Sequence, residues 1–361
     1  MNFVKATRQF EQWLGSHTPL VKRDLRLKHQ RMAEGVFPFL RATFYRWVQV
    51  WPGICAEASR APRVLAVGDL HIENFGTWRD SEGRLIWGIN DFDEAALLPY
   101  SSDLIRLATS ALLAIEAGHL ALKNKQACGA ILEGYRESLQ AEGRPFVLEE
   151  ENKWLRKLAT GELRNPVHFW EEMDELPPLR GEVPASARAA LESLLPEPGL
   201  EYRIARRVAG LGSLGRMRFV AIAECHGGRI AREAKALVPS SVYWATEAER
   251  ATGTLYQSIL NGAVRAHDPF VRVRGRWIVR RLSPHCCRVE LSELPQDRDE
   301  LRLLFAMGWE TANIHQGSKR AVGEVSRHLN KLKGNWLSSS AKAMARAVLG
   351  DWRAWRSSGP S

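Results

Sequence analysis

The spacing of hydrophobic residues shifts from a mainly helical to a strand-rich pattern near residue 200 of this 361-residue chain, and this shift limits the folds open to it. Residues 1–60 and two segments within residues 102–141 have apolar residues at helical spacing. Residues 171–200 hold five prolines, which predict a linker or irregular crossing with one short helix, ASARAALESLL. The chain then predicts strands in RIARRVAG, RMRFVAIAE, IAREAKAL and WIVRRLS, and a helix follows over residues 299–315.

The composition weighs against several classes of protein. Hydrophobic residues make up 45% and charged residues 25%, the usual balance for a globular protein. No run of about 18 uncharged apolar residues exists, so no transmembrane helix is expected. The start of the chain, MNFVKATRQFEQWLG, lacks the apolar core of a secretory signal. The cysteines are odd in number and scattered, which predicts reduced thiols in a cytoplasmic protein: Cys55, Cys128, Cys225, Cys286 and Cys287.

The chain is basic, with a net charge of +10 and a pI of about 9.6. A basic surface favours anionic partners such as nucleotides, phosphorylated metabolites, nucleic acid or membrane lipid. The excess is spread through the chain, whereas nucleic-acid binders more often gather it on one element with interleaved aromatic residues. The charge alone does not choose among these partners.

Polar residues follow two predicted strands, RVLAV and RLIWGI, at the point where each strand ends. Asp69 and Asn74 lie five residues apart in GDLHIENFG, and Asp91 and Asp93 lie in NDFD. Two carboxylates and an amide oxygen suit Mg²⁺, and a further carboxylate can orient or deprotonate a hydroxyl. This spacing is typical of the catalytic loop and metal loop of kinases. The alternative is a set of acidic loops that only cap strands.

A glycine segment, with Gly210, Gly212, Ser213 and Gly215, lies between two of the predicted strands. In a dinucleotide-binding domain the GxGxxG pattern opens a helix, and an acidic residue follows about 20 positions later. Here a strand follows, and Lys235 stands at about that spacing. This order is typical of the hairpin that covers the nucleotide in a kinase, where glycines let backbone amides approach phosphate. The alternative is an ordinary hairpin with a surface lysine.

The order of these parts differs from that of a standard kinase, because the catalytic loop comes before the glycine segment. WIVRRLS is typical of the hinge strand, and the helix LRLLFAMGWETANIHQG that follows it would lead directly into the catalytic loop of a standard kinase. The parts are therefore expected in circularly permuted order. An acidic residue after Lys235 should hold that lysine, and we prefer Glu249 to Glu247.

These motifs give the chain a resemblance to an uncharacterised bacterial family, the domain-of-unknown-function 2252 family. The resemblance covers roughly residues 22–320 and rests on KHQRMAEGVFPFLRAT, GDLHIENFG, NDFDEA, DLIRLA, RVAGLGSLG, REAKAL, IVRRLS and WETANIHQGS, in this order. The motifs of that family look like those of the protein-kinase-like superfamily, closest to aminoglycoside and choline phosphotransferases. There the catalytic loop reads HGDxHxxN and the metal strand reads IDFD or IDWE.

The resemblance implies roles for individual residues. Asp69 resembles the catalytic base, and Asn74 and Asp91 resemble the metal ligands, with Asp93 as the alternative to Asp91. Lys235 resembles the lysine that pairs with phosphates. The phosphate loop corresponds to Gly210, Gly212, Ser213 and Gly215.

Five further residues qualify this interpretation. Val67 departs from the family pattern, which has His before Gly-Asp. His71 is shared with the GDxH motif of metallophosphoesterases, but their other motifs are absent, so we expect it to pack under the loop. Arg41 is expected to pair with a carboxylate, Asp103 to cap its helix and brace the catalytic loop, and His315 to act as a cation at its helix end.

The predicted fold is α+β, a two-lobed protein-kinase-like fold in circularly permuted order, with a small β-rich nucleotide lobe and a larger helical lobe. The basic tail helix is expected to be solvated or docked rather than bound to lipid or nucleic acid. The expected parts are residues 1–60 (N-terminal helical segment), 61–170 (catalytic and metal loops), 171–200 (Pro-rich linker), 201–298 (small lobe with glycine segment and Lys235), 299–335 (helix returning to the large lobe) and 336–361 (basic amphipathic tail).

The predicted function is an ATP- and Mg²⁺-dependent phosphotransferase that acts on a hydroxyl of a small-molecule acceptor, with a protein acceptor as a second option. Two other classes stay open: a nucleotide-binding pseudokinase that acts as a sensor or scaffold, and a basic nucleic-acid-binding protein. The joint presence of Asp69, Asn74, Asp91 and Lys235 favours the enzyme, because a pseudokinase has no chemical need for the complete set. The spread of basic charge weighs against nucleic acid and hints at an acidic acceptor.

Overall fold

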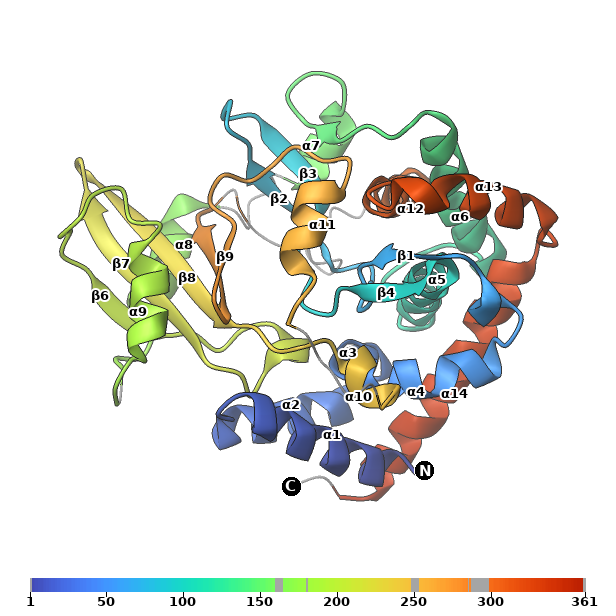
Figure 1. Cartoon of the computed structure of the whole chain (residues 1–361), viewed down its shortest axis with the longest axis horizontal. Coiled ribbons are helices and arrows are strands. Elements are labelled where there is room, and N and C mark those ends of the chain that lie inside the picture. The colour runs from blue at the N-terminus through green and yellow to red at the C-terminus, as the bar shows by residue number, and fades with distance from the viewer. Residues whose placement is uncertain are drawn as a thin grey trace.

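The small antiparallel sheet of this protein lies to one side of a larger, mostly helical body (Figure 1), which confirms the expected α+β class. These features come from a computed structural model. It describes residues 2–159, 165–179, 181–247, 253–284, 286 and 299–359. Within these ranges every helix is too short or too polar to cross a membrane.

The larger body takes helices from both ends of the chain. The N-terminal ones are α1 (Phe3–His17), α2 (Lys22–Glu34), α3 (Val36–Ala42), α4 (Phe44–Ile54) and the 3₁₀ helix η1 (Ala58–Arg60). The others are α5 (Tyr100–Glu116), α6 (Asn124–Gln140), α7 (Lys153–Ala159), α12 (Glu300–His315), α13 (Lys319–Lys331) and α14 (Trp336–Ser357). The helices expected in residues 1–60, 102–141, 299–315 and 336–356 are confirmed.

Helix α5 is the centre of the main core. Every residue from Tyr100 to Ala114 is buried, because α5 is apolar over most of its circumference and other helices pack around it. Helices α6, α12 and α14 contact it, as does strand β1. The polar residues Asp103 and Arg106 are buried along with the apolar ones, so each needs a partner inside the protein.

Helices α6 and α12 approach closely because each has a glycine at the crossing. A Cβ atom on Gly134 would lie 1.9 Å from the carbonyl oxygen of Phe305, and one on Gly308 would lie 2.0 Å from that of Ile131. No side chain fits at either position without a shift of the backbone. This close crossing holds α12 in position, and α12 ends at His315.

Two short antiparallel sheets lie in the larger body. Strand β1 (Arg63–Ala66) pairs with β4 (Ala96–Pro99), and β2 (Phe75–Arg79), β3 (Leu85–Ile89) and β5 (Phe146–Val147) form the second sheet. The strands expected at residues 63–67 and 84–89 are β1 and β3. Strands β2 and β4 were not expected, because short strands next to polar loops have little periodicity of their own.

The small sheet has five antiparallel strands in the order β6-β7-β8-β10-β9. Their bounds are β6 (Arg203–Arg206), β7 (Arg218–Cys225), β8 (Gly228–Ala236), β9 (Arg272–Arg274) and β10 (Trp277–Leu282). The four expected strands are confirmed, and β9 is an addition. The glycine segment connects β6 to β7 through the 3₁₀ helix η3 (Leu211–Ser213).

Two helices cover opposite faces of the small sheet. Helix α9 (Ala185–Glu192) packs on Phe219 and Ala221, and Met173 of α8 (Pro166–Asp174) packs on Val220 and Ile222. Neighbouring residues of a strand point to opposite faces, so the sheet is covered on both. Part of the Pro-rich segment 171–200 therefore belongs to the core of the small sheet and does more than connect.

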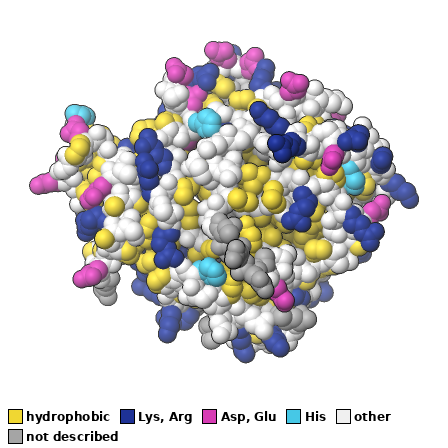
Figure 2. Space-filling model, viewed as in Figure 1, with side chains coloured by type: hydrophobic (Ala, Val, Ile, Leu, Met, Phe, Trp, Pro, Cys, Tyr) yellow, Lys and Arg dark blue, Asp and Glu magenta, His cyan; other side chains and the backbone are white. Residues whose placement is uncertain are grey.

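Two short helices, α10 (Ser241–Ala245) and α11 (Tyr256–Gly262), follow β8 and pack on the core of the larger body. The tail helix α14 is docked, because its apolar face is buried against α5 and the N-terminal helices. Its Trp355 contacts Phe3 with ring centroids 5.6 Å apart. Lys and Arg lie scattered among acidic and apolar side chains on the face that Figure 2 shows.

Two substitutions in α6 test the close crossing with α12. Gly134→Ala should lower the free energy of unfolding by about 2–3 kcal/mol, because the added methyl group meets a backbone carbonyl. Gly129→Ala is the control, since a Cβ atom there meets nothing within 4 Å, and it should stabilise the protein by about 0.5–1 kcal/mol. Urea unfolding measures both. Equal effects of the two substitutions would contradict the close packing.

Candidate active site

A cleft lies where the glycine segment meets the loops that follow β1 and β3. It encloses about 700 Å³ of empty space, including the part open to solvent. The N-terminal helices supply a third wall. The cleft brings together most of the expected site residues, namely Asp69, Asn74, Asp91, Asp93, Gly210, Gly212 and Ser213.

The loop that carries Asp69 is held from below by Asp103. One carboxylate oxygen of Asp103 accepts a hydrogen bond from the backbone N–H of Val67 at 2.7 Å, and the other accepts one from Gly68 at 3.0 Å. Nε2 of His315, at the end of α12, lies 3.0 Å from the first of these oxygens. Asp103 is fully buried, so these contacts are screened little by solvent.

Arg106 fixes the orientation of Asp69. Its Nε donates to Oδ1 of Asp69 at 2.9 Å, and its Nη2 donates to the same oxygen and to the carbonyl of Leu40 at 2.8 Å. The guanidinium lies 5.0 Å from the ring centroids of Phe44 and Trp47. Both of its hydrogen bonds to Asp69 fall on Oδ1, so Oδ2 is left for a group that enters the cleft.

Gly68 lets the two polar loops approach each other. Its φ of +84° is one that side-chain-bearing residues rarely adopt, and a Cβ atom would lie only 2.3 Å from the carbonyl oxygen of Glu94. The loop with Asp69 and the loop with Asp91, Asp93 and Glu94 therefore pack backbone to backbone.

Burial changes the acid–base behaviour of these carboxylates. It raises the pKa of Asp69 to about 7, although the charge of Arg106 acts in the opposite direction. Burial also raises the pKa of Asp93 and of Glu94. A carboxylate with a pKa near 7 can exchange a proton with a substrate at neutral pH.

Asn74 and the Asp91 loop form a candidate metal site. The register of β2 and β3 places Asn74 beside Asn90, whose N–H donates to the Asn74 carbonyl at 3.1 Å. Nδ2 of Asn74 donates to the backbone carbonyl of Asp69 at 3.0 Å, while its Oδ1 is buried with no hydrogen-bond partner among the described residues. The Asp91 carboxylate lines the same cleft and is 28% exposed. A buried amide oxygen without a donor beside a carboxylate suits a hard cation.

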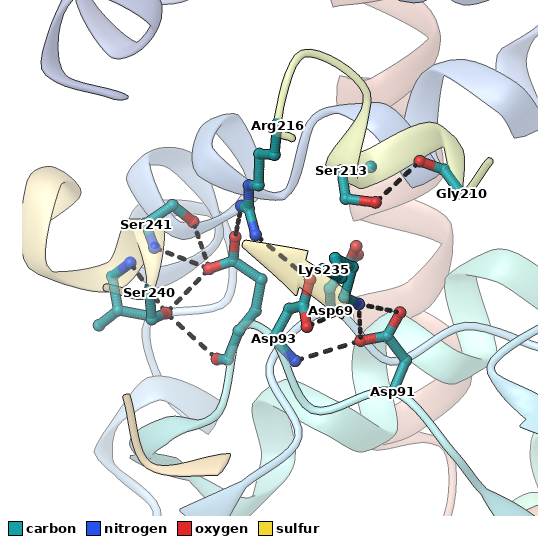
Figure 3. A network of polar contacts seen from close by, with 12 residues as sticks. Asp69, Asp91, Asp93, Gly210, Ser213, Arg216, Lys235, Ser240 and Ser241 are labelled. Atoms are coloured by element: carbon teal, nitrogen blue, oxygen red, sulfur yellow. Dashed lines mark hydrogen bonds and ion pairs between the residues drawn. The ribbon is translucent and has the colours of Figure 1, made fainter. Parts of the chain in front are cut away.

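Two cations contact the same loop, Lys235 of β8 and Arg216, which lies just before β7 (Figure 3). Nζ of Lys235 lies 2.8 Å from Asp93 and 3.5 Å from Asp91. Arg216 bridges Asp93, at 3.2 Å, and Glu94, at 3.5 Å. Asp93 is engaged by two cations and is 10% exposed, whereas Asp91 is 28% exposed, so Asp91 is the more accessible carboxylate for a metal.

The glycine segment lies directly over Asp69. Gly210 has a φ of +75° and Gly215 one of +98°, and a Cβ atom on Gly212 would lie 3.4 Å from Oδ2 of Asp69 and 3.1 Å from the carbonyl of Arg41. Larger residues at position 212 would push the segment off the carboxylate. Gly215 itself lies outside the cleft lining and packs on Leu25 of α2.

A buried network ties the glycine segment to the sheet. Oγ of Ser213 accepts from Arg218 at 2.7 Å, and Arg218 pairs with Glu233 at 3.2 Å. Glu233 also pairs with Arg207 and Arg280, each at 2.8 Å. Burial opposes its ionisation, but the three arginines hold the pKa of Glu233 well below its usual range. The segment is therefore anchored to the strand that carries Lys235.

The sequence predicted that Glu249, or else Glu247, would hold Lys235. The described ion-pair partners of Lys235 are Asp91 and Asp93, and Glu247 is not among them. Glu249 lies outside the described residues.

The expectation that Asp103 braces the loop with Asp69 is confirmed, because it accepts hydrogen bonds from Val67 and Gly68. Asp103 does not cap α5, however, because Pro99 holds that position and Asp103 lies in the first turn. His315 is not a surface cation but is buried between Asp103 and Tyr135. Arg41 pairs with Glu73, as expected, and His71 is packed under the loop.

Four residues that line or support the cleft were not predicted from the sequence. Glu94 follows NDFD directly, and Arg216 follows the glycine segment directly. Arg106 lies three residues after Asp103, a spacing that puts both on one face of α5 and was a usable signal. Lys28 lies in α2, in a motif with no chemical signature of its own.

Asp103→Ala tests the brace under the catalytic loop. Loss of two hydrogen bonds to a buried carboxylate should lower the free energy of unfolding by about 3 kcal/mol and speed amide hydrogen exchange at Val67 and Gly68. Asp80→Ala is the control, because Asp80 accepts hydrogen bonds from Glu82 and Arg84 in the β2–β3 turn, away from the cleft. Faster exchange at Val67 in the control as well would contradict a local brace.

A comparison with known families bears on the part of the chain that holds these loops. Residues 20–165 match the model of a family described as an uncharacterised protein conserved in bacteria, the domain-of-unknown-function 2252 family. The sequence predicted a resemblance over residues 22–320. The match ends at residue 165, so the glycine segment and Lys235 lie outside it. No curated protein matches the chain, and no solved structure does. The chain is thus similar to this uncharacterised family over residues 20–165.

Proposed function

We propose that this protein is an ATP- and Mg²⁺-dependent phosphotransferase that acts on a hydroxyl group of a small-molecule acceptor. One observation carries the proposal: a glycine segment lies over a half-buried carboxylate, Asp69, in a cleft that also holds Asn74 and Asp91. Backbone amides of a glycine loop can bind phosphate oxygens, and a carboxylate beneath them can receive the proton of an attacking hydroxyl.

The candidate metal site fits Mg²⁺. Asn74 offers a buried amide oxygen without a donor, and Asp91 offers a carboxylate in the same cleft, with Asp93 as the alternative. Bound Mg²⁺ neutralises charge on the transferred phosphoryl group. Asn74 and Asp91 would hold it, and Lys235 would orient both Asp91 and Asp93 and pair with phosphate oxygens when a nucleotide enters.

Transfer needs only positioning and one proton acceptor. Oδ2 of Asp69 faces the cleft and would accept the hydroxyl proton while the acceptor oxygen attacks the γ-phosphorus and the bond to the ADP oxygen breaks. Arg106 keeps Oδ1 occupied and so fixes the direction of Oδ2. Most of the rate enhancement would come from alignment and from fixed charges around the phosphates.

The arrangement of the elements supports a two-lobed, circularly permuted kinase-like fold. The small sheet has a glycine segment between its first two strands and a lysine on the third, as a kinase small lobe does. Helix α12 follows this sheet in the chain, and His315 at its end contacts Asp103, which holds the catalytic loop. The end of α12 therefore meets the start of that loop in space, as continuous chain does in a standard kinase.

Two other functions remain distinguishable from this one. A pseudokinase would bind nucleotide saturably but transfer nothing, so label from [γ-³²P]ATP would appear on no acceptor. A nucleic-acid binder would lose affinity steeply as salt rises, without regard to nucleotide. On the face that Figure 2 shows, the basic side chains are scattered among acidic and apolar ones, which does not favour binding of single- or double-stranded nucleic acid there.

Asp69→Asn tests the catalytic role. Transfer of label from [γ-³²P]ATP to the small molecules of a deproteinised bacterial extract should fall about a thousandfold, because the amide cannot accept the proton. Binding of Mg²⁺-ATP should stay within about threefold, since Asn keeps an oxygen for Arg106. Asp174→Asn, in an exposed ion pair on α8, is the control and should leave transfer intact. Near-normal transfer by Asp69→Asn would refute the assignment.

The pH dependence of transfer should report the same residue. Asp69 must be ionised to accept a proton, and burial raises its pKa to about 7. The rate should therefore fall as the pH drops below about 7, and bound Mg²⁺ would move this limb to lower pH because a positive charge favours the carboxylate. A pH–rate profile from about pH 5.5 to about pH 8.5 measures it. A rate that rises as the pH falls would contradict the role of Asp69 as base.

A further inference from the structure

One wall of the cleft is mainly apolar and is formed by the N-terminal helices. Phe10, Leu14, Phe44 and Tyr45 line it with apolar and aromatic surface. Two charged side chains of these helices line the cleft with them, Arg41 of α3 and Lys28 of α2. Nζ of Lys28 lies 6.0 Å from the ring centroid of Tyr45. None of these residues belongs to the glycine segment or to the metal loop.

Lys28 differs from the other cations of the site in its partner. Lys28 is 4% exposed, and its hydrogen bond within the described part of the chain goes to the neutral carbonyl of Gly212, at 3.3 Å. The other cations each pair with a carboxylate: Arg41 with Glu73, Arg106 with Asp69, Arg216 with Asp93 and Glu94, and Lys235 with Asp91 and Asp93.

A buried ammonium without a carboxylate is destabilising, because its lost hydration is not replaced. Burial lowers the pKa of Lys28 to about 8, so the side chain is still largely charged at neutral pH. It lines a cleft that is open to solvent and that also holds Asp69. The charges of Glu11, Glu94 and Asp69 favour the ammonium, but none of the three forms an ion pair with it. An anion that enters the cleft would supply the direct ion pair that the described protein residues do not.

We propose, on the basis of the phosphotransferase function above, that Lys28 binds an acidic group of the acceptor. The acceptor is then a hydroxyl compound with an apolar or aromatic body and one carboxylate or phosphate. Lys235 and Arg216 already stand at the metal loop for the nucleotide phosphates. Lys28 comes from the apolar wall instead, so its anion belongs to the molecule that this wall contacts.

Four benzyl alcohols that differ at the para position test this charge preference. The anionic probes are 4-(hydroxymethyl)benzoate and 4-(hydroxymethyl)phenyl phosphate, the neutral probe is 4-(hydroxymethyl)benzamide, and the cationic probe is 4-(hydroxymethyl)benzylamine. Ligand-observed NMR on the full chain without nucleotide measures their dissociation constants. At least one anionic probe should bind about tenfold more tightly than the amide, and the amine should bind most weakly.

Variants at position 28 assign the preference to this side chain. Lys28→Met should bring the anionic probes within about twofold of the amide, and Lys28→Arg should keep the preference. The melting temperature of the ligand-free Met variant should equal or exceed that of the wild type, because a buried charge is removed. Lys28 would be only a structural clamp on Gly212, and the proposal overturned, if Lys28→Met melted lower while the probes bound equally or not at all.

A nucleotide arm separates the acceptor from the γ-phosphate. If Lys28 bound the γ-phosphate, Lys28→Met would weaken Mg²⁺-ATP but not Mg²⁺-ADP about tenfold, and that result would overturn the acceptor assignment. Equal affinities of wild type and variant for ATP are expected. If the wild type binds no Mg²⁺-ATP but keeps the probe preference, the phosphotransferase function fails while the anion site at Lys28 stands.

Discussion

The candidate active site depends on one buried carboxylate, that of Asp103. It accepts hydrogen bonds from two successive backbone amides of the loop that presents Asp69, and it meets His315 from another part of the chain. A fully buried carboxylate is costly unless it is satisfied in this way. Helix α5, which carries it, is buried along most of its length, so the loop rests on a tightly packed part of the protein.

The rest of the site is assembled by charge across the cleft. Lys235 and Arg216 connect the small sheet to the loop with Asp91, Asp93 and Glu94. Asp91 is the most exposed carboxylate of that loop, at 28% against 10% for Asp93 and for Glu94. A nucleotide would replace protein–protein ion pairs by protein–phosphate ones, which costs less than bringing unpaired cations together.

Much of the fold and of the site could be predicted from the sequence. Strands β1 and β3 could be predicted because each is a short apolar run that polar residues follow. The polar residues at their ends include Asp69 and Asp91. The contacts around these residues could not be predicted in full. The spacing of Arg106 from Asp103 puts both on one face of α5, but the contact of Arg106 with Asp69 and that of Lys28 with Gly212 come from tertiary packing. The Pro-rich segment 171–200 was expected to be a linker. Its sequence does not indicate that its short helices pack on the small sheet.

The central claim is that Mg²⁺-ATP binds in this cleft, with Asp91 as a metal ligand. The most direct test is the melting temperature of wild type and of Asp91→Ala, with and without Mg²⁺-ATP. At a ligand concentration of about 100 times the dissociation constant, binding stabilises the wild type by about 2.7 kcal/mol, a shift of a few degrees for a chain of this size. We expect a shift that needs Mg²⁺ and disappears in Asp91→Ala. No shift at millimolar ATP, or an equal shift in both proteins, would contradict it.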